Sequence, residues 1–160
     1  MQVVRENEFD YRNAKEILEE LEPKLLKEIY DILDNKNFKL NLKKTGGERQ
    51  LSKPIQDEFV KRGWEKEVQP KALSDLRYDL MKNNIPIEIE IGHERLVYAD
   101  FFKFLADYSK EQIPCGIIVV TNNPRDFGHT WHNSVASTRK KLEAVSEQYL
   151  VPILVIPIKP

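Results

Sequence analysis

Residues 76–91 read LRYDLMKNNIPIEIEI, with one largely apolar run on each side of Asn83-Asn84. Asparagine tolerates a positive φ angle, so this pair suits a tight turn between two antiparallel strands. We therefore expect a β-hairpin whose strands cover residues 76–81 and 85–91. This hairpin decides how the rest of the chain is interpreted.

The second strand of the hairpin alternates strictly between isoleucine and another residue. Its isoleucines share one face, while Glu88 and Glu90 share the other face, about 7 Å apart along the strand. If Asn83-Asn84 forms the turn, the register places Asp79 opposite Glu88, with Cβ atoms about 5 Å apart. Like charges at that distance destabilise a sheet unless a cation lies between them, and a hard divalent cation prefers such oxygen ligands. The pattern indicates a metal site.

The same residues also fit a simpler interpretation. Glu88 and Glu90 can decorate the solvated face of a half-buried hairpin, with Arg77 opposite Glu90 in a surface ion pair. The hairpin alone does not distinguish the two interpretations. The order of the other predicted elements along the chain favours the metal site.

Apolar residues at helical spacing over residues 13–33 predict one amphipathic helix or two, depending on the effect of Pro23. Ser134 is a suitable N-cap for the last helix, and prolines in the last strand suggest a sheet edge. The predicted order is α-α-β-β-β-α-β-α-β, an α/β fold in one domain over residues 1–160 with a central mixed sheet flanked by helices. The remaining predicted helices cover residues 48–62, 99–110 and 134–149. The remaining strands are an extended segment that opens at Trp64 and residues 113–121 and 151–158.

Composition narrows the class of protein. No segment reaches the roughly 20 apolar residues of a membrane span, and the first ten residues lack a signal-peptide hydrophobic region, so we expect a cytoplasmic protein. Cys115 is the single cysteine and lies in an apolar run, which indicates a buried small hydrophobe. A net charge of −1 argues against a uniformly basic nucleic-acid coat protein, but not against local phosphate binding.

Asp79, eight further residues and then Glu88-Ile89-Glu90 together resemble the active-site motif of the PD-(D/E)xK nuclease superfamily. Glu90 stands where that motif usually has lysine, as in the BamHI, BglII and BstYI group of type II restriction endonucleases. The apolar segment 115–120 is also similar to that group, and the resemblance covers residues 46–120. Tyr78 departs from the proline of the motif, and the chain looks shorter than familiar members, so we expect their DNA-reading loops to be trimmed or absent.

The resemblance implies a restriction-endonuclease-like fold and a homodimer that cuts double-stranded DNA at a short palindrome, leaving 5′-phosphate and 3′-hydroxyl ends. It implies that Asp79, Glu88 and the carbonyl oxygen of Ile89 hold Mg²⁺, for which Mn²⁺ can substitute. Asp79, Glu88 and Glu90 are the expected catalytic residues. Glu90 would act as base, orient water or assist a second metal, and these roles remain open. The helical region 13–33 is a candidate for part of the dimer interface.

Two more charged residues are considered in relation to this site. Glu48 could add a carboxylate from the preceding helix, or be an ordinary first-turn glutamate favoured by the helix dipole. Lys103 could face phosphate, but we expect a solvated helix lysine and leave it out of the catalytic set.

His129 and His132, separated by Thr130-Trp131, offer a competing interpretation as a histidine-metal centre. Zinc sites need four ligands, and Cys115 and His93 are the only other soft or borderline donors, so a turn lined by aromatic residues is favoured. This turn could also approach DNA as a recognition loop. Two non-enzyme alternatives stay open: a DNA-binding protein that keeps the nuclease fold without cutting, and a structural domain with solvated acids.

Overall fold

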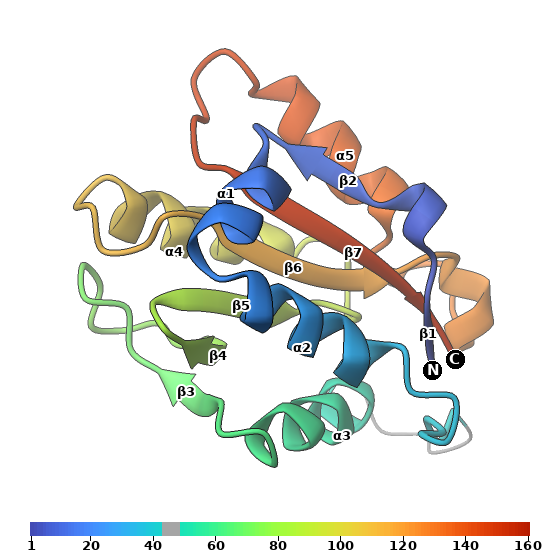
Figure 1. Ribbon diagram of the computed structural model, residues 1–160. Coiled ribbons are helices and arrows are strands. Elements are labelled where there is room, and N and C mark those ends of the chain that lie inside the picture. Colours follow the sequence, from blue (N-terminus) through green and yellow to red (C-terminus); the bar gives the residue numbers. More distant parts are fainter. Residues whose placement is uncertain (43–48) are drawn as a thin grey trace.

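The computed structural model describes residues 1–42 and 49–160. Its centre is a seven-stranded mixed sheet in the order β1-β7-β6-β5-β4-β3, with β2 also paired to β7 (Figure 1). The strands are β1 (Gln2–Val3), β2 (Phe9–Tyr11), β3 (Glu65–Val68), β4 (Tyr78–Lys82), β5 (Ile85–Ile89), β6 (Gly116–Thr121) and β7 (Ile153–Lys159). The helices are α1 (Ala14–Leu21), α2 (Pro23–Leu33), α3 (Arg49–Val60), α4 (Val97–Tyr108) and α5 (Val135–Ala144), with short 3-10 helices η1 (Arg5–Asn7) and η2 (Pro124–Phe127).

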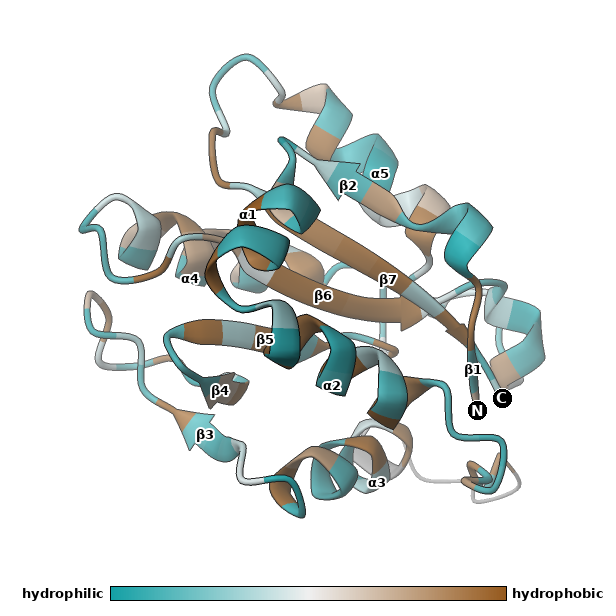
Figure 2. Ribbon diagram, viewed as in Figure 1, coloured by the Kyte–Doolittle hydropathy of each residue, from teal (hydrophilic) through white to brown (hydrophobic). Residues whose placement is uncertain are grey.

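Helices cover both faces of the sheet. In Figure 1, α1 and α2 lie in front of the strands and α4 and α5 lie behind them. Two buried apolar clusters follow from this arrangement: Ile87 and Ile117 pack on the side of α1 to α3, whereas Ile118 and Val155 pack on the side of α4 and α5. Figure 2 shows the resulting pattern, with apolar central strands and polar outer helix surfaces. The predicted α/β class with a mixed, helix-flanked sheet is confirmed.

The hairpin has the predicted turn and register. Asn83 and Asn84 both have positive φ angles, 51° and 61°, as a tight turn of this kind requires. The antiparallel partners Leu80 with Ile87, Met81 with Pro86 and Lys82 with Ile85 follow the register expected from that turn. β5 pairs with β4 on one side and runs parallel to β6 on the other.

Pro23 divides the N-terminal helical region into two helices. α1 ends at Leu21, and Pro23 occupies the first turn of α2, where its missing N–H has no intrahelical partner to lose. Ser134 caps α5 as predicted, since its hydroxyl accepts a hydrogen bond from the backbone of Ser137 at 3.2 Å.

The prediction that the last strand is a sheet edge is wrong. β7 is an interior strand, parallel to β6 and antiparallel to β1 and β2, two short strands that the sequence did not reveal. Pro157 is tolerated because it lies between the segments paired with β1 and β2. The N–H and C=O of one strand residue point to the same side. The carbonyl oxygen of Pro157 accepts a hydrogen bond from the Val4 backbone, so the N–H that proline lacks would also point away from β6, into the space between β1 and β2.

Two expectations from composition can be compared with the structure. Cys115 is fully buried, and burial raises the pKa of its thiol to about 12, so it behaves as a small core residue. Among the helices of the described ranges, none is both long and apolar enough to cross a membrane.

Candidate active site

The candidate site forms where β4 and β5 stop pairing through their backbones. Past the pair Leu80 and Ile87, side chains replace the backbone acceptors of the ladder. The backbone N–H of Asp79 donates to Glu88 Oε2 at 3.3 Å, and the N–H of Ile89 donates to Asp79 Oδ2 at 2.8 Å. The two carboxylates and the Ile89 backbone are therefore held together by the local chain geometry.

The face of β5 that carries Glu88 is covered, not solvated. Glu88 is only 3% exposed because α4 packs over it, while Ile87 and Ile89 face the opposite core. Arg77, proposed as a surface partner of Glu90, donates to the carbonyl oxygens of Ser74 and Leu76. The surface-decoration interpretation is therefore wrong for Glu88.

The prediction that Lys103 is a solvated helix lysine is also wrong. Lys103 is 6% exposed, and its ammonium forms ion pairs with Glu88 and, at 3.0 Å, with Asp100. It also donates to the carbonyl oxygen of Arg77 at 2.9 Å. The side chain of Glu90, half-buried just after the end of β5, hydrogen-bonds to Asp100. β4, β5 and α4 thus contribute to one polar cluster.

Burial dominates the electrostatics of this cluster. Desolvation raises the pKa of Asp79 to about 6, although the hydrogen bond from Ile89 opposes the change. Desolvation, followed by the charges of Asp100 and Asp79, raises the pKa of Glu88 well above its ordinary value. The pKa of Asp100 is also raised by burial, against the effect of Lys103. Burial lowers the pKa of Lys103, but Glu88 and Asp100 together outweigh it, so the lysine stays charged.

A cleft of about 550 Å³ opens beside Asp79. Gln56 of α3 is 5% exposed and lines this cleft, as does Glu67 of β3, a non-glycine residue with a φ of 55°. The charge of Glu67 is one of the causes that raise the pKa of Asp79. Lys53 and Lys66 also line this cleft, and the ammonium of Lys66 forms an ion pair with Asp57 at 3.0 Å.

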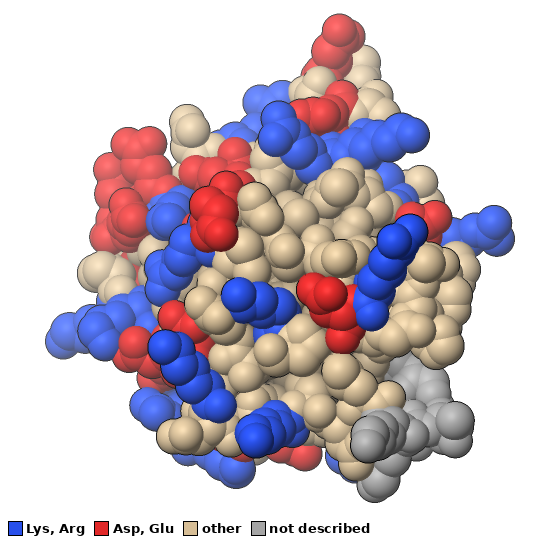
Figure 3. Space-filling model, turned by 90° about the vertical axis from the view of Figure 1, so that its right-hand side faces the viewer, with Lys and Arg blue, Asp and Glu red and all other residues tan. Residues whose placement is uncertain are grey.

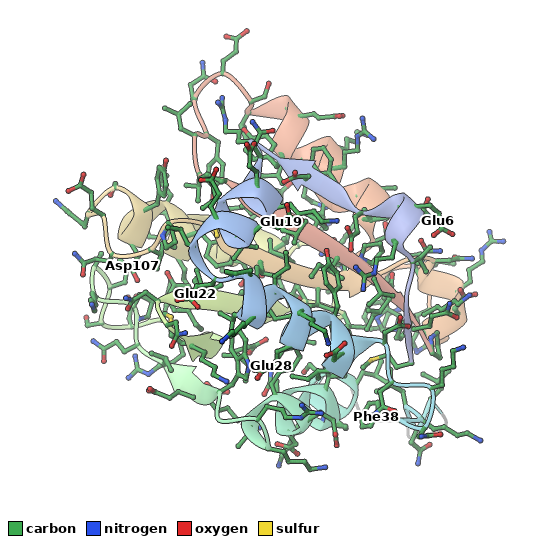
Figure 4. The ribbon with its side chains drawn as sticks, viewed as in Figure 1. Glu6, Glu19, Glu22, Glu28, Phe38 and Asp107 are labelled. Atoms are coloured by element: carbon green, nitrogen blue, oxygen red, sulfur yellow. The ribbon has the colours of Figure 1, made fainter. Side chains whose placement is uncertain are left out.

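Asp107, at the end of α4 (Figure 4), anchors the segment that leads into β4. It accepts hydrogen bonds from the backbone of Lys71 and Ala72 at 3.3 and 2.8 Å and from the hydroxyl of Tyr78 at 3.1 Å. The single hydroxyl hydrogen of Tyr78 is shared between Asp107 and the carbonyl oxygen of Lys103, which also lies 3.1 Å from the hydroxyl oxygen. These bonds fix the start of β4 against α4 and so fix Asp79 relative to Lys103.

Sequence reasoning missed Asp100, Gln56 and Glu67 and misjudged Lys103. The signal for two of them lies in α4: Asp100, Lys103 and Asp107 fall at helical spacing on the same face as its buried apolar residues. Charged residues on an apolar helix face are rarely buried unless they are paired. Glu48, the helix carboxylate that was considered, lies outside the described residues.

The donor set fits a divalent cation. Glu88 and Asp100 contact the ammonium of Lys103, the Asp79 backbone donates to Glu88, and Glu90 hydrogen-bonds to Asp100, so four carboxyl groups belong to one cluster. Carboxylate oxygens are the ligands that Mg²⁺ and Mn²⁺ prefer. Within residues 1–42 and 49–160, however, no three His, Cys, Asp or Glu side chains already form a metal-binding group. The ammonium of Lys103 contacts two of the acids that such a group would use.

The histidine loop forms an aromatic stack. Trp131 stacks on His129 and His93, with ring centroids 4.9 and 5.9 Å apart, and His132 packs beside it, 3% exposed. No metal-binding group includes these histidines in the part of the chain that the structure describes. The loop is fixed to the segment after β5, since Asn133 donates to the carbonyl of Gly92 at 2.7 Å. The aromatic turn is the better description.

This mixed sheet, with acids where β4 and β5 diverge and helices on both faces, has a counterpart among solved nuclease structures. The crystal structure of restriction endonuclease BglII complexed with a DNA 16-mer matches the chain with a TM-score of 0.74 and 19% sequence identity. The match covers 99% of this chain and 76% of that chain, so this protein has the restriction-endonuclease fold. The comparison with curated proteins found no match.

The family model described as restriction endonuclease BglII/BglIII matches residues 7–158, and the chain belongs to that family. It is a type II site-specific deoxyribonuclease. The resemblance drawn from Asp79, Glu88 and Glu90 is confirmed at the level of the family.

Proposed function

We propose that this nuclease hydrolyses phosphodiester bonds of double-stranded DNA at a short palindromic site, in a reaction that depends on Mg²⁺ or Mn²⁺, and leaves 5′-phosphate and 3′-hydroxyl ends. The observation that carries the proposal is the linkage of Asp79 to Glu88 and to the Ile89 backbone at the point where β4 and β5 diverge. Asp79, one member of this linked set, lines an open cleft.

In this proposal Asp79, Glu88 and the carbonyl oxygen of Ile89 hold the cation. When bound, the cation supplies charge neutralisation at the phosphate and makes water a better nucleophile. Glu90 orients the attacking water or accepts its proton, because it lies next to this set and is more exposed than Glu88. Lys53 and Lys66 attract the DNA backbone into the cleft.

DNA binding does not require a uniformly basic surface here. Figure 3 shows one face on which basic and acidic side chains are interspersed over a largely uncharged surface, in keeping with the net charge of −1. Phosphate contacts are therefore expected to be local to the cleft, and the affinity to depend on few ion pairs.

A homodimer follows from the proposed palindromic site, because two equivalent strands call for two sites related by a two-fold axis. The N-terminal helices are poorly suited to the interface, because most of their apolar residues, such as Leu25 and Ile29, are buried in this chain's own core, and Leu21 alone among them is strongly exposed. α4 offers a better surface. Tyr98, Phe102 and Leu105 form an apolar stripe along its outer side, with the first two more than half exposed.

The stripe borders an apolar groove of about 360 Å³ between α4 and α5, which Val145 also lines. A two-fold axis through this surface would bury the stripe of each copy against the other, and exposed apolar patches of this kind mark association sites. We therefore propose the outer faces of α4 and α5 as the dimer interface.

The decisive experiment incubates the protein with plasmid DNA and Mg²⁺ and sequences the resulting ends. Discrete fragments with one common end sequence are expected, and none in excess EDTA. Asp79→Ala and Glu88→Ala should each abolish cleavage without unfolding the protein, whereas Asp31→Asn, an exposed acid on α2 paired with Lys27, should leave cleavage unchanged. Full activity of either site variant, or cleavage in EDTA, would show that the site or the metal requirement has been assigned wrongly.

A further inference from the structure

Lys103 is the cation of the acid cluster, and all its donors are in use. Its ammonium contacts Glu88 Oε1, lies 3.0 Å from Asp100 Oδ1, and donates to the Arg77 carbonyl oxygen at 2.9 Å. An ammonium group has three N–H donors, so these three acceptors satisfy it. The side chain is 8% exposed, so little water reaches it.

Both oxygens of Glu88 are engaged as the side chains lie in the structure. Oε1 contacts Lys103, and Oε2 accepts from the backbone of Asp79. Each carboxylate oxygen has two lone pairs, so a divalent cation that takes Glu88 as a ligand can bind Oε2 beside the Asp79 N–H or compete with the ammonium at Oε1, and in both positions it lies close to the charge of Lys103. Two cations that share one carboxylate at short range repel each other.

We infer that Lys103 is an internal counter-ion that competes with the divalent cation for Glu88, an inference that rests on the proposed metal-dependent function. Without the cation, the ammonium offsets the charges of Glu88 and Asp100 and keeps the cluster folded. A cation held by Glu88 would take the place of the ammonium at that carboxylate, while Lys103 would keep Asp100 and the Arg77 carbonyl as partners.

A purely structural role for Lys103 predicts the opposite effect on metal affinity. If the lysine only held Glu88 in position, its removal would loosen a ligand and weaken cation binding. If it competes, its removal leaves four carboxyl groups without their nearest positive charge and strengthens cation binding. The sign of the change in the dissociation constant therefore separates the two roles.

The test is isothermal titration of the DNA-free protein with Mg²⁺, and separately with Ca²⁺, at neutral pH. Lys103→Met keeps the length of the side chain and removes its charge, and we expect its dissociation constant to fall by about tenfold, since unit charges a few ångströms apart interact strongly near a protein surface. Lys82→Met is the matched control. Lys82 lies at the other end of β4 and pairs with Glu28, so its loss should leave the dissociation constant unchanged.

An unchanged or weaker affinity of Lys103→Met would overturn the inference. If the wild-type protein itself binds neither cation at millimolar concentration, the proposed metal-dependent function fails, which is a separate result. If Lys103→Met does not fold, the NMR resonance of the Lys103 ammonium in the wild-type protein decides between the two roles instead. This resonance is assigned by its absence from the spectrum of Lys103→Arg. It should shift in step with Ca²⁺ saturation, and a resonance that Ca²⁺ leaves unmoved would refute the exchange.

Discussion

Replacing Asp79 by asparagine should stabilise the protein at pH 8 in the absence of divalent cations, while removing its cleavage activity. The amide has the same shape as the carboxylate, and its oxygen can still accept the hydrogen bond that Ile89 donates at 2.8 Å. What changes is the charge. At pH 8 the carboxylate of Asp79 is ionised inside a cluster whose other members include Glu88 and Asp100.

The magnitude follows from the pKa of Asp79, which burial raises from 3.8 to about 6. Because the folded protein binds this proton more tightly than the unfolded chain, the stability that this group contributes is full below pH 3.8 and is lost as the pH rises through 6. A shift of this size corresponds to about 3 kcal/mol, which is an upper limit for the gain in Asp79→Asn. For a chain of this length, 1 kcal/mol moves the melting temperature by about 2–4 °C.

The assay is thermal and urea denaturation in EDTA at pH 5 and pH 8. The melting temperature of Asp79→Asn should exceed that of the wild type at pH 8, and the gap should narrow at pH 5. Asp31→Asn, at an exposed position, should change the stability by less than about 0.5 kcal/mol at either pH. Added Mg²⁺ should stabilise the wild type and not Asp79→Asn. A variant that melts below the wild type at pH 8 in EDTA would refute the argument that the cluster is destabilised by its own charge.

Three further outcomes are expected. Glu90→Lys should cut plasmid DNA at least about tenfold more slowly yet bind DNA more tightly in EDTA, because it removes a negative charge beside the phosphate; unchanged cleavage would remove Glu90 from the site. Phe102→Glu should shift the mass measured by light scattering from dimer to monomer, since it places a charge in the apolar stripe, and a dimer of unchanged stability would exclude the α4 surface. Tyr78→Phe should lower the unfolding free energy in urea by about 1–3 kcal/mol, because Asp107 loses a buried donor, and a neutral effect would show that this anchor is dispensable.

The hairpin could be predicted from the sequence because its information is local. Asn83 and Asn84 specify the turn, the turn specifies the register, and the alternation after Pro86 specifies which face each side chain takes. Nothing more distant is needed to bring Asp79 to Glu88. The acid pair was therefore accessible from a short stretch of chain.

Lys103 could not be judged in the same way, because its environment is set by tertiary packing. A lysine on a helix is solvated by default, and only the docking of α4 over β5 makes it a buried partner of Glu88. β1 and β2 were missed for a similar reason: two or three residues carry too little periodicity to predict a strand, and both exist only because β7 offers them an edge. Because β1 and β2 pair with the outer side of β7, this strand is interior. The prolines of segment 151–158 therefore wrongly indicated an edge strand.

Two backbone amides, those of Asp79 and Ile89, donate to carboxylates of the site, so their hydrogen exchange reports on the positions of those carboxylates. The amide of Ile89 is protected from exchange with solvent by Asp79, and the amide of Asp79 by Glu88, where an ordinary sheet would use carbonyl groups. Amide hydrogen exchange at these two positions therefore measures whether each carboxylate is in place. A cation that draws either side chain away would be visible as faster exchange at its partner amide, before any DNA is added.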